Sequence, residues 1–164
     1  MSAKRIFEGK HVIVLERDGW EFVERRTARE AVAIVAITGD GQLVLTEQFR
    51  PPVNAQVIDL PAGIIEEFDA AETARRELEE ETGFTCDRMQ LLAKSPTSPG
   101  ITSEIVHYYR AINVRKIGSG GGVNGEHITV HVVALRDMER WLGSQYSLID
   151  LKLRAGLYFA AQST

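Results

Sequence analysis

Residues 61–84 read PAGIIEEFDAAETARRELEEETGF, and this stretch decides how the rest of the chain is interpreted. Asp69 and Glu72 stand at the spacing of a helix capping box, in which two side chains satisfy backbone N–H groups at the start of a helix. Gly83 is a typical helix stop, because glycine readily adopts the left-handed conformation that ends a helix. The sequence therefore predicts a helix that begins at Ala70 and ends just before Gly83.

The predicted helix carries several carboxylates on one face. Residues three and four positions apart are neighbours on a helix, so Glu77, Glu80 and Glu81 share a face while Glu79 points elsewhere. Such a run is often only a solvated surface. Here an apolar stripe fixes the buried side of the helix, and its members are Ala70, Ala71, Ala74 and Leu78. Carboxylates held this close repel one another unless a cation or an arginine lies among them, and Mg²⁺ prefers such oxygen ligands.

Length and composition bound the class of protein. With 164 residues and 44% hydrophobic content, the chain fits one domain, residues 1–164, with a substantial core. The net charge of −4 disfavours a general nucleic-acid binder. Cys86 is the only cysteine, no apolar run reaches the length of a membrane span, and the first residues lack the apolar segment of a signal peptide. We therefore expect a soluble cytoplasmic protein with no nucleic-acid or membrane partner.

The remaining sequence predicts a strand-rich chain. Asp18-Gly19 is a hairpin signal between two short strands, and GSGGGVNG at residues 118–125 predicts a mobile loop. Strands are expected from alternating or continuous apolar runs, at residues 11–16, 20–25, 31–37, 43–48, 57–60, 89–94, 104–114 and 128–132. Helices are expected at residues 137–142 and 148–161. No linker or internal repeat divides the chain, so the pattern favours a single α+β domain.

Residues 76–84, RELEEETGF, match the second half of the Nudix box, G-x5-E-x7-R-E-U-x-E-E-x-G-U, at every fixed position. The first half departs from the pattern. Its glycine is Gly63 while Ala62 stands at the box position, and Phe68 or Asp69 replaces the outer glutamate. The chain thus resembles the Nudix hydrolases with one residue lost from the loop before the helix, a loss that leaves the metal-binding cluster intact.

The resemblance covers the chain from Trp20 onward, and its flanking motifs are similar to those of the ADP-ribose pyrophosphatases. These motifs are EQFRPP at residues 47–52, DLPAG at 59–63, SPGITSE at 98–104 and GEHITVH at 125–131. The resemblance implies the Nudix fold, an α/β/α sandwich with a mixed central sheet. It also implies an N-terminal extension of antiparallel strands, within residues 1–27, through which two copies form a homodimer.

The implied reaction is the metal-dependent hydrolysis of the diphosphate bond of a nucleoside diphosphate sugar, with ADP-ribose giving AMP and ribose 5-phosphate. The implied cofactor is Mg²⁺, with Mn²⁺ as the alternative. By resemblance the metal is held by carboxylates and one backbone carbonyl, those of Glu77, Glu80, Glu81, Glu126 and Ala62. Arg76 pairs with a box glutamate and orients it. Asn124 stands where related enzymes often carry an acidic general base, so Glu126 or a box glutamate would have to activate the water.

Five further residues are expected to contact the substrate by resemblance. Arg50 suits bidentate binding of the diphosphate, and Glu104 would accept hydrogen bonds from the sugar hydroxyls. Trp20 and Arg25 lie in strands that help to hold the adenine in the family, although Trp20 fits a core position equally well. Asp59 lies in one of the shared motifs and is either a substrate contact or a structural residue.

Two other interpretations stay open. The substrate could be another nucleoside diphosphate derivative, such as GDP-mannose, a dinucleoside polyphosphate or an RNA 5′ end, or the protein could be a non-catalytic nucleotide-sugar sensor. The histidines do not indicate a metal site, because His127 and His131 would lie about 13 Å apart along a strand.

Overall fold

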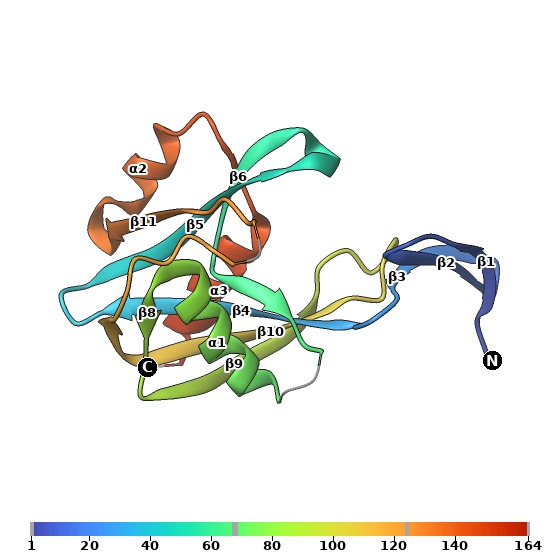
Figure 1. The fold of residues 1–164 in the computed structure, drawn as a ribbon, viewed down its shortest axis with the longest axis horizontal. Coiled ribbons are helices and arrows are strands. Elements are labelled where there is room, and N and C mark those ends of the chain that lie inside the picture. The colour runs from blue at the N-terminus through green and yellow to red at the C-terminus, as the bar shows by residue number, and fades with distance from the viewer. Residues whose placement is uncertain (1, 67–68, 124, 164) are drawn as a thin grey trace.

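The computed structural model describes residues 2–66, 69–123 and 125–163. Within these residues the strands form two separate sheets, a nine-stranded mixed sheet in the body of the protein and a three-stranded antiparallel sheet near the N-terminus. The small sheet extends from one side of the body as an arm (Figure 1). The predicted α+β class and the N-terminal strand extension are therefore confirmed.

The arm consists of β1 (Lys4–Glu8), β2 (Val12–Arg17) and β3 (Trp20–Arg25), paired in that order. Asp18 and Gly19 have positive φ angles of 53° and 83°, as a two-residue hairpin turn requires, so the predicted turn is confirmed. The sequence did not indicate β1. All five of its residues are exposed, so no buried alternation marks it as a strand.

The body is organised around a hairpin that opens into two half-sheets. β4 (Glu30–Thr38) and β5 (Gln42–Arg50) are the hairpin predicted from two apolar runs. The two strands pair at Ile37 and Leu43, next to the turn, and then diverge. Each strand continues into a different half-sheet, so the start of β4 and the end of β5 stand apart.

Four strands complete the half-sheet of β4, and three complete that of β5. The first group is β7 (Ala62–Ile64), β8 (Phe84–Thr85), β9 (Arg88–Pro96) and β10 (Ile105–Lys116). The second group is β6 (Ala55–Asp59), β11 (Thr129–Ala134) and β12 (Leu148–Ile149). The β4–β10 and β6–β12 pairs are parallel and the others are antiparallel, so the central sheet is mixed, as predicted.

Helices cover both faces of this sheet (Figure 1). α1 (Ala70–Thr82) lies on one face and α3 (Leu151–Ala161) on the opposite face, while α2 (Met138–Gly143) follows β11. Two 3₁₀ turns, η1 (Pro51–Val53) and η2 (Leu135–Asp137), join neighbouring elements. The predicted α/β/α layering is confirmed.

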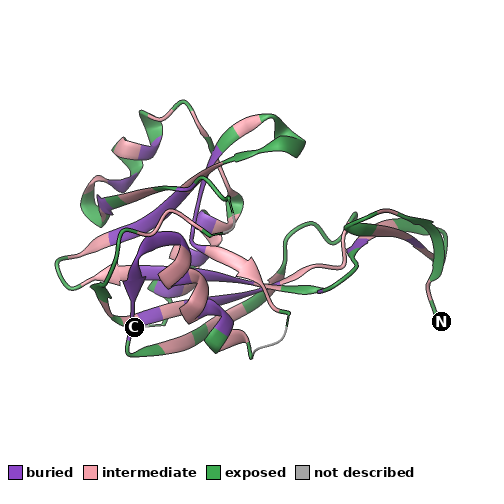
Figure 2. Cartoon of the chain, in the orientation of Figure 1, coloured by how far each residue is buried: buried purple, intermediate pink, exposed green. Residues whose placement is uncertain are grey.

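Alternate residues of β4 face the two helical layers. Val32 and Ile34 belong to the apolar core under α1, and Ala33 and Val35 belong to the core under α3. All four side chains are fully buried, and the purple strands at the centre of Figure 2 trace this double-sided burial. A strand covered on both faces needs a continuous apolar run rather than an alternating one, which is why residues 31–37 stand out in the sequence.

The start of the last helix differs from the prediction. The helix expected over residues 148–161 begins at Leu151, because the Asp150 carboxylate accepts a hydrogen bond from the Lys152 N–H at 2.9 Å and caps the helix there. Leu148 and Ile149 instead pair with β6 as β12. Among the described residues, no helix combines the length and the apolar composition that a membrane crossing requires.

Candidate active site

A cavity of about 970 Å³ lies where β4 and β5 diverge, and it is large enough for a nucleotide-sized ligand. Most residues predicted to form the site line it, namely Arg25, Arg50, Asp59, Ala62, Arg76, Glu77, Glu80, Glu81, Glu104 and Glu126. Trp20 does not line it. This residue is 67% exposed at the start of β3, so Trp20 does not occupy the core position that the sequence also allowed, and its contact with the substrate stays a prediction.

Helix α1 brings the carboxylates to this cavity. Asp69 Oδ1 accepts hydrogen bonds from the N–H groups of Ala71 and Glu72, at 2.8 and 3.0 Å, and Gly83 ends the helix with a φ of 71°. The predicted helix over residues 70–82 is therefore confirmed at both ends. Ala74 and Leu78 are fully buried under the helix, and this anchoring turns the glutamate face toward the cavity.

Gly63 lets strand β7 pass directly beside Glu77. A Cβ atom at position 63 would lie 2.2 Å from Cδ of Glu77, closer than any two non-bonded carbons can approach. Glu77 Oε1 also accepts a hydrogen bond from Nη2 of Arg76 at 3.0 Å, in keeping with the orienting role expected for that arginine. The glycine and the arginine together fix where the Glu77 carboxylate stands.

Replacing Gly63 with alanine should therefore displace Glu77 and disable the site. A catalytic group moved by about 1 Å can cost roughly 100-fold in rate, so we expect a loss of that order in kcat for Gly63→Ala. Gly39 serves as the matched control, because a Cβ there meets open space. Equal activity of Gly63→Ala and Gly39→Ala would contradict the assignment.

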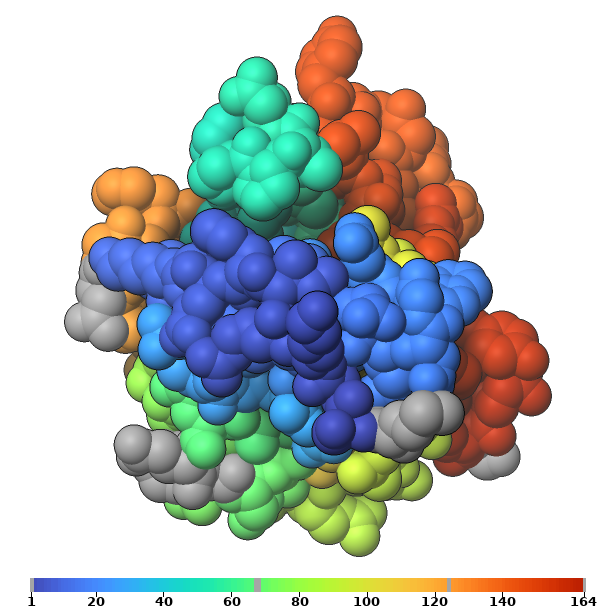
Figure 3. All heavy atoms as spheres, turned by 90° about the vertical axis from the view of Figure 1, so that its right-hand side faces the viewer, coloured from blue at the N-terminus to red at the C-terminus, as the bar shows by residue number. Residues whose placement is uncertain are grey.

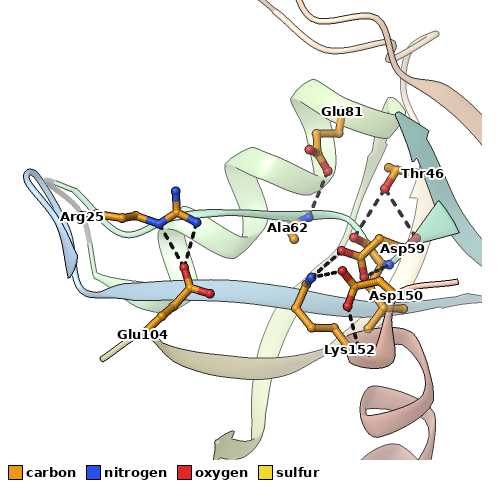
Figure 4. A network of polar contacts seen from close by, with 9 residues as sticks. Arg25, Thr46, Asp59, Ala62, Glu81, Glu104, Asp150 and Lys152 are labelled. Atoms are coloured by element: carbon orange, nitrogen blue, oxygen red, sulfur yellow. Dashed lines mark hydrogen bonds and ion pairs between the residues drawn. The ribbon is translucent and has the colours of Figure 1, made fainter. Parts of the chain in front are cut away.

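Glu81 is the most deeply buried of the α1 glutamates that line the cavity. Its Oε2 accepts a hydrogen bond from the Ala62 N–H at 3.0 Å (Figure 4). The pKa of Glu81 is raised to about 8, mainly by burial and also by the carboxylates of Glu77 and Glu126, while the Ala62 N–H and Arg50 act to lower it. Burial likewise raises the pKa of Glu77, against the pull of Arg76.

These buried and mutually repelling carboxylates fit a hard divalent cation, which would replace the proton that burial otherwise favours. Glu77 and Glu81 would hold it. In the described part of the chain, no three acidic, histidine or cysteine side chains gather around one point suited to an ion. Glu80 and Glu126, which also line the cavity, would therefore complete the set by turning toward it.

The metal-free protein should lose stability as the pH rises. A glutamate titrates near 4.5 in the unfolded chain and near 8 at position 81 in the folded one, so between these values the folded state holds a proton that the unfolded state lacks. The contribution of this group to the free energy of unfolding is fully present below pH 4.5. It is lost as the pH rises toward 8, by at most about 1.4 kcal/mol per pH unit. Chemical denaturation in a chelator across this range measures the slope, and Glu81→Gln should remove the share that comes from Glu81, leaving any share from Glu77, whose pKa is also raised.

The glycine-rich loop packs on the end of α1. The N–H groups of Gly121 and Gly122 donate to the carbonyl oxygens of Glu81 and Glu80, at 2.8 and 3.1 Å. A Cβ at position 120 would lie 2.3 Å from the backbone carbonyl carbon of Thr82, so only glycine lets the loop lie this close to the end of α1. Residues 118–122 thus cap the helix carbonyls that lack intrahelical partners, instead of forming the free loop that the sequence suggested.

The loop also brings an acid to the cavity. Glu126 lines the cavity together with Val123, whose N–H donates to Glu126 Oε2 at 3.3 Å. The position predicted to lack a general base, Asn124, lies outside the described residues.

The far wall of the cavity contains an ion-pair cluster that the sequence did not indicate. Lys152 Nζ lies 2.8 Å from Asp59 Oδ2 and 2.6 Å from Asp150 Oδ2 (Figure 4). Burial lowers the pKa of Lys152, but the two carboxylates outweigh it and raise that pKa overall. Asp59 also accepts the Leu60 N–H at 2.8 Å, so its contacts here are structural. No local spacing links Asp59 to Lys152, which is why the pair was missed.

Two substrate-binding predictions meet in one ion pair. Arg25, at the end of β3, donates a hydrogen bond from Nε to Glu104 Oε2 at 3.0 Å, and its Nη2 forms an ion pair with the same oxygen at 2.9 Å (Figure 4). Arg50 lines the cavity at the end of β5. His131 bonds Glu47 at 2.7 Å, and no histidine of the described residues lines this cavity.

Comparison with known proteins identifies the family. The NUDIX domain model matches residues 27–151, and the chain therefore belongs to the NUDIX family, as its box indicated. It is a hydrolase of the class that acts on phosphorus-containing anhydrides.

Two relatives and one solved structure are similar over most of the chain. A methanol dehydrogenase activator from Bacillus methanolicus is 36% identical over 132 residues, 76% of this chain and 71% of that protein. An ADP-ribose pyrophosphatase from Bacillus subtilis is 36% identical over 119 residues, 68% of this chain and 64% of that protein. The crystal structure of an ADP compounds hydrolase superposes with a TM-score of 0.74 at 21% identity, covering 99% of this chain and 91% of that one, and supports the fold.

Proposed function

We propose that this protein hydrolyses the diphosphate bond of nucleoside diphosphate sugars, with ADP-ribose as the first candidate. One observation carries the proposal. The glutamates of α1, Glu126 and Arg50 line a single cavity, although they come from three distant parts of the chain. The similarity to an ADP-ribose pyrophosphatase supports the same choice of substrate.

Different residues of the cavity would have different roles in this reaction. Arg50 would bind the diphosphate, and Glu104 would accept hydrogen bonds from the hydroxyls of the sugar. Water attacks one phosphorus, and the bond from that phosphorus to the bridging oxygen breaks. The products are two phosphate monoesters, AMP and ribose 5-phosphate when ADP-ribose is the substrate.

A divalent cation, Mg²⁺ or Mn²⁺, would neutralise the charge of the diphosphate and help to activate the attacking water. Glu77 and Glu81 would hold this cation, with Glu80, Glu126 and the carbonyl oxygen of Ala62 as further ligands. The proton of the attacking water would pass to Glu126 or to a glutamate of α1, since an asparagine at position 124 cannot accept it.

One second candidate has support of its own. The similarity to a protein named as a methanol dehydrogenase activator supports the alternative that this chain is a regulatory protein or sensor. Other nucleoside diphosphate derivatives, such as GDP-mannose or a dinucleoside polyphosphate, would use the same cavity chemistry.

The buried single cysteine, Cys86, fits the cytoplasmic location expected from the sequence.

A substrate panel tests the proposal. ADP-ribose, GDP-mannose, a dinucleoside polyphosphate and a nucleoside triphosphate are incubated with the protein and Mg²⁺, and the products are identified by mass. Turnover of ADP-ribose to AMP and ribose 5-phosphate supports the proposal, and faster turnover of another compound corrects the substrate. Binding of ADP-ribose without any turnover would favour the sensor.

We further propose that two copies form a homodimer through the arm. Figure 3 views the molecule toward the arm, drawn in blue, which stands in front of the body. Ile6, Phe7 and Trp20 are at least half exposed there. Such a group of large apolar side chains in contact with water is unusual on the surface of a monomer. Light scattering should give twice the 18.2 kDa of one chain, and a Phe7→Ser/Trp20→Ser variant should give the single mass. Tyr146→Ser, on the exposed surface of the body, is the control.

A further inference from the structure

The arm pairs with the loop that carries Glu104. The N–H of Val23 in β3 donates to the carbonyl of Ile101 at 2.8 Å, and the N–H of Ser103 donates back to the carbonyl of Val23 at 3.4 Å. Val23 and Thr102 form a parallel bridge between these two segments. The loop before β10 thus takes the place of an added strand beside β3, so its position depends on the arm.

A buried carboxylate secures this contact. Glu24 is only 6% exposed, although most of the arm faces solvent. Its Oε2 accepts a hydrogen bond from Ser103 Oγ at 2.9 Å, and its Oε1 lies 2.8 Å from Nη2 of Arg29. A buried charge is costly unless it is paired, so Glu24 holds the loop and the residue just before β4 at one fixed point.

The next residue of β3 reaches the cavity itself. Both donors of Arg25 contact the same oxygen, Oε2 of Glu104, and both side chains line the cavity. The N–H of Glu104 also donates to Oγ1 of Thr102, at 3.2 Å, which fixes the turn into β10. No described residue hydrogen-bonds Oε1 of Glu104, so this oxygen is available to a ligand.

We propose that Glu24 and Arg25 are positioning residues, through which the N-terminal arm sets the Glu104 carboxylate and thereby the affinity of the cavity for the sugar of its substrate. Glu24 acts through Ser103, and Arg25 acts by its direct ion pair. The inference rests on the proposed function, because it takes the ligand of the Glu104 carboxylate to be the sugar of the substrate. Neither residue belongs to the glutamate cluster of α1, so loosening them should weaken binding without slowing bond cleavage.

Steady-state kinetics with ADP-ribose tests this separation. Ser103→Ala, Glu24→Gln and Arg25→Ala should each raise KM by about tenfold while kcat stays within about twofold, since the interaction is the same in substrate and transition state. Arg25→Lys, which can keep the ion pair, should recover part of the loss. Arg26→Ala is the matched control, because Arg26 pairs with Glu8 inside the arm and does not line this cavity.

Hydrogen exchange of the Val23 and Ser103 amides gives a second readout that needs no activity. Exchange should quicken in Ser103→Ala and Glu24→Gln and stay unchanged in Arg26→Ala. Ser103→Ala removes only a hydroxyl, so it remains informative even if Glu24→Gln fails to fold. A fall in kcat at unchanged KM, or equal exchange in all variants, overturns the proposal. If the wild type cleaves no compound of the panel, the proposed function fails, and exchange alone then decides whether Glu24 positions the loop.

Discussion

Glu81→Gln should lower kcat by about 1,000-fold, because it removes a negative charge that would hold the divalent cation beside the diphosphate. Glutamine has nearly the same shape, and its amide oxygen can still accept the Ala62 N–H that Glu81 accepts at 3.0 Å. The fold should therefore survive. Steady-state rates with Mg²⁺ measure the loss, and thermal unfolding of the same samples checks the fold.

The same variant should be more stable than the wild type when metal is absent at pH 8. The pKa of the buried wild-type carboxyl group is raised to about 8, so at pH 8 the group is partly ionised without a partner. Glutamine carries no charge at any pH. Mg²⁺ should stabilise the wild type and leave the variant almost unchanged. Glu79→Gln serves as control, since Glu79 bonds Thr85 and does not line the cavity. Full activity in Glu81→Gln would remove this glutamate from the metal site.

Lys152→Met should destabilise the protein by about 3–5 kcal/mol, because it leaves the buried Asp59 carboxylate without its cation. For a chain of this length such a loss corresponds to roughly 10 °C in Tm. Asp150 should tolerate the change better, since it is partly exposed and still caps α3. Thermal or denaturant unfolding measures the effect.

Removing both charges should restore most of that stability. In Asp59→Asn/Lys152→Met neither buried group is charged, and replacing a whole buried ion pair is often nearly neutral. The double-mutant cycle therefore separates the cost of an unpaired charge from the value of the pair. If the double variant is as unstable as Lys152→Met alone, packing rather than charge explains the loss.

Local signals predicted the parts of this molecule whose causes are local. The helix over residues 70–82 was foreseen at both ends, because its cap at Asp69 and its stop at Gly83 lie next to the residues they act on. The hairpin of β4 and β5 was also foreseen, since a strand buried on both faces leaves a continuous apolar run. Most of the residues that the motifs named as site residues likewise line the cavity.

Long-range contacts account for what the sequence did not reveal. Lys152 meets Asp59 across more than half of the chain, and Arg25 meets Glu104 through a loop that only the fold brings near. β12 was assigned to a helix, because its two residues are strand only by pairing with β6. β1 is a strand only by pairing with β2, and no pattern within these five residues reports it.

The contact between residues 118–122 and the end of α1 also limits which changes of sequence such a chain can accept during evolution. The segment must keep its length and its glycines at 120–122, because these residues have positive φ angles and the N–H groups of Gly121 and Gly122 have to meet the helix carbonyls of Glu81 and Glu80. Insertions and deletions should therefore be tolerated in the turn at Gly39, where a side chain meets open space, and rejected between Gly118 and Gly122. A stretch that looks like an unconstrained spacer would then prove among the least variable in length.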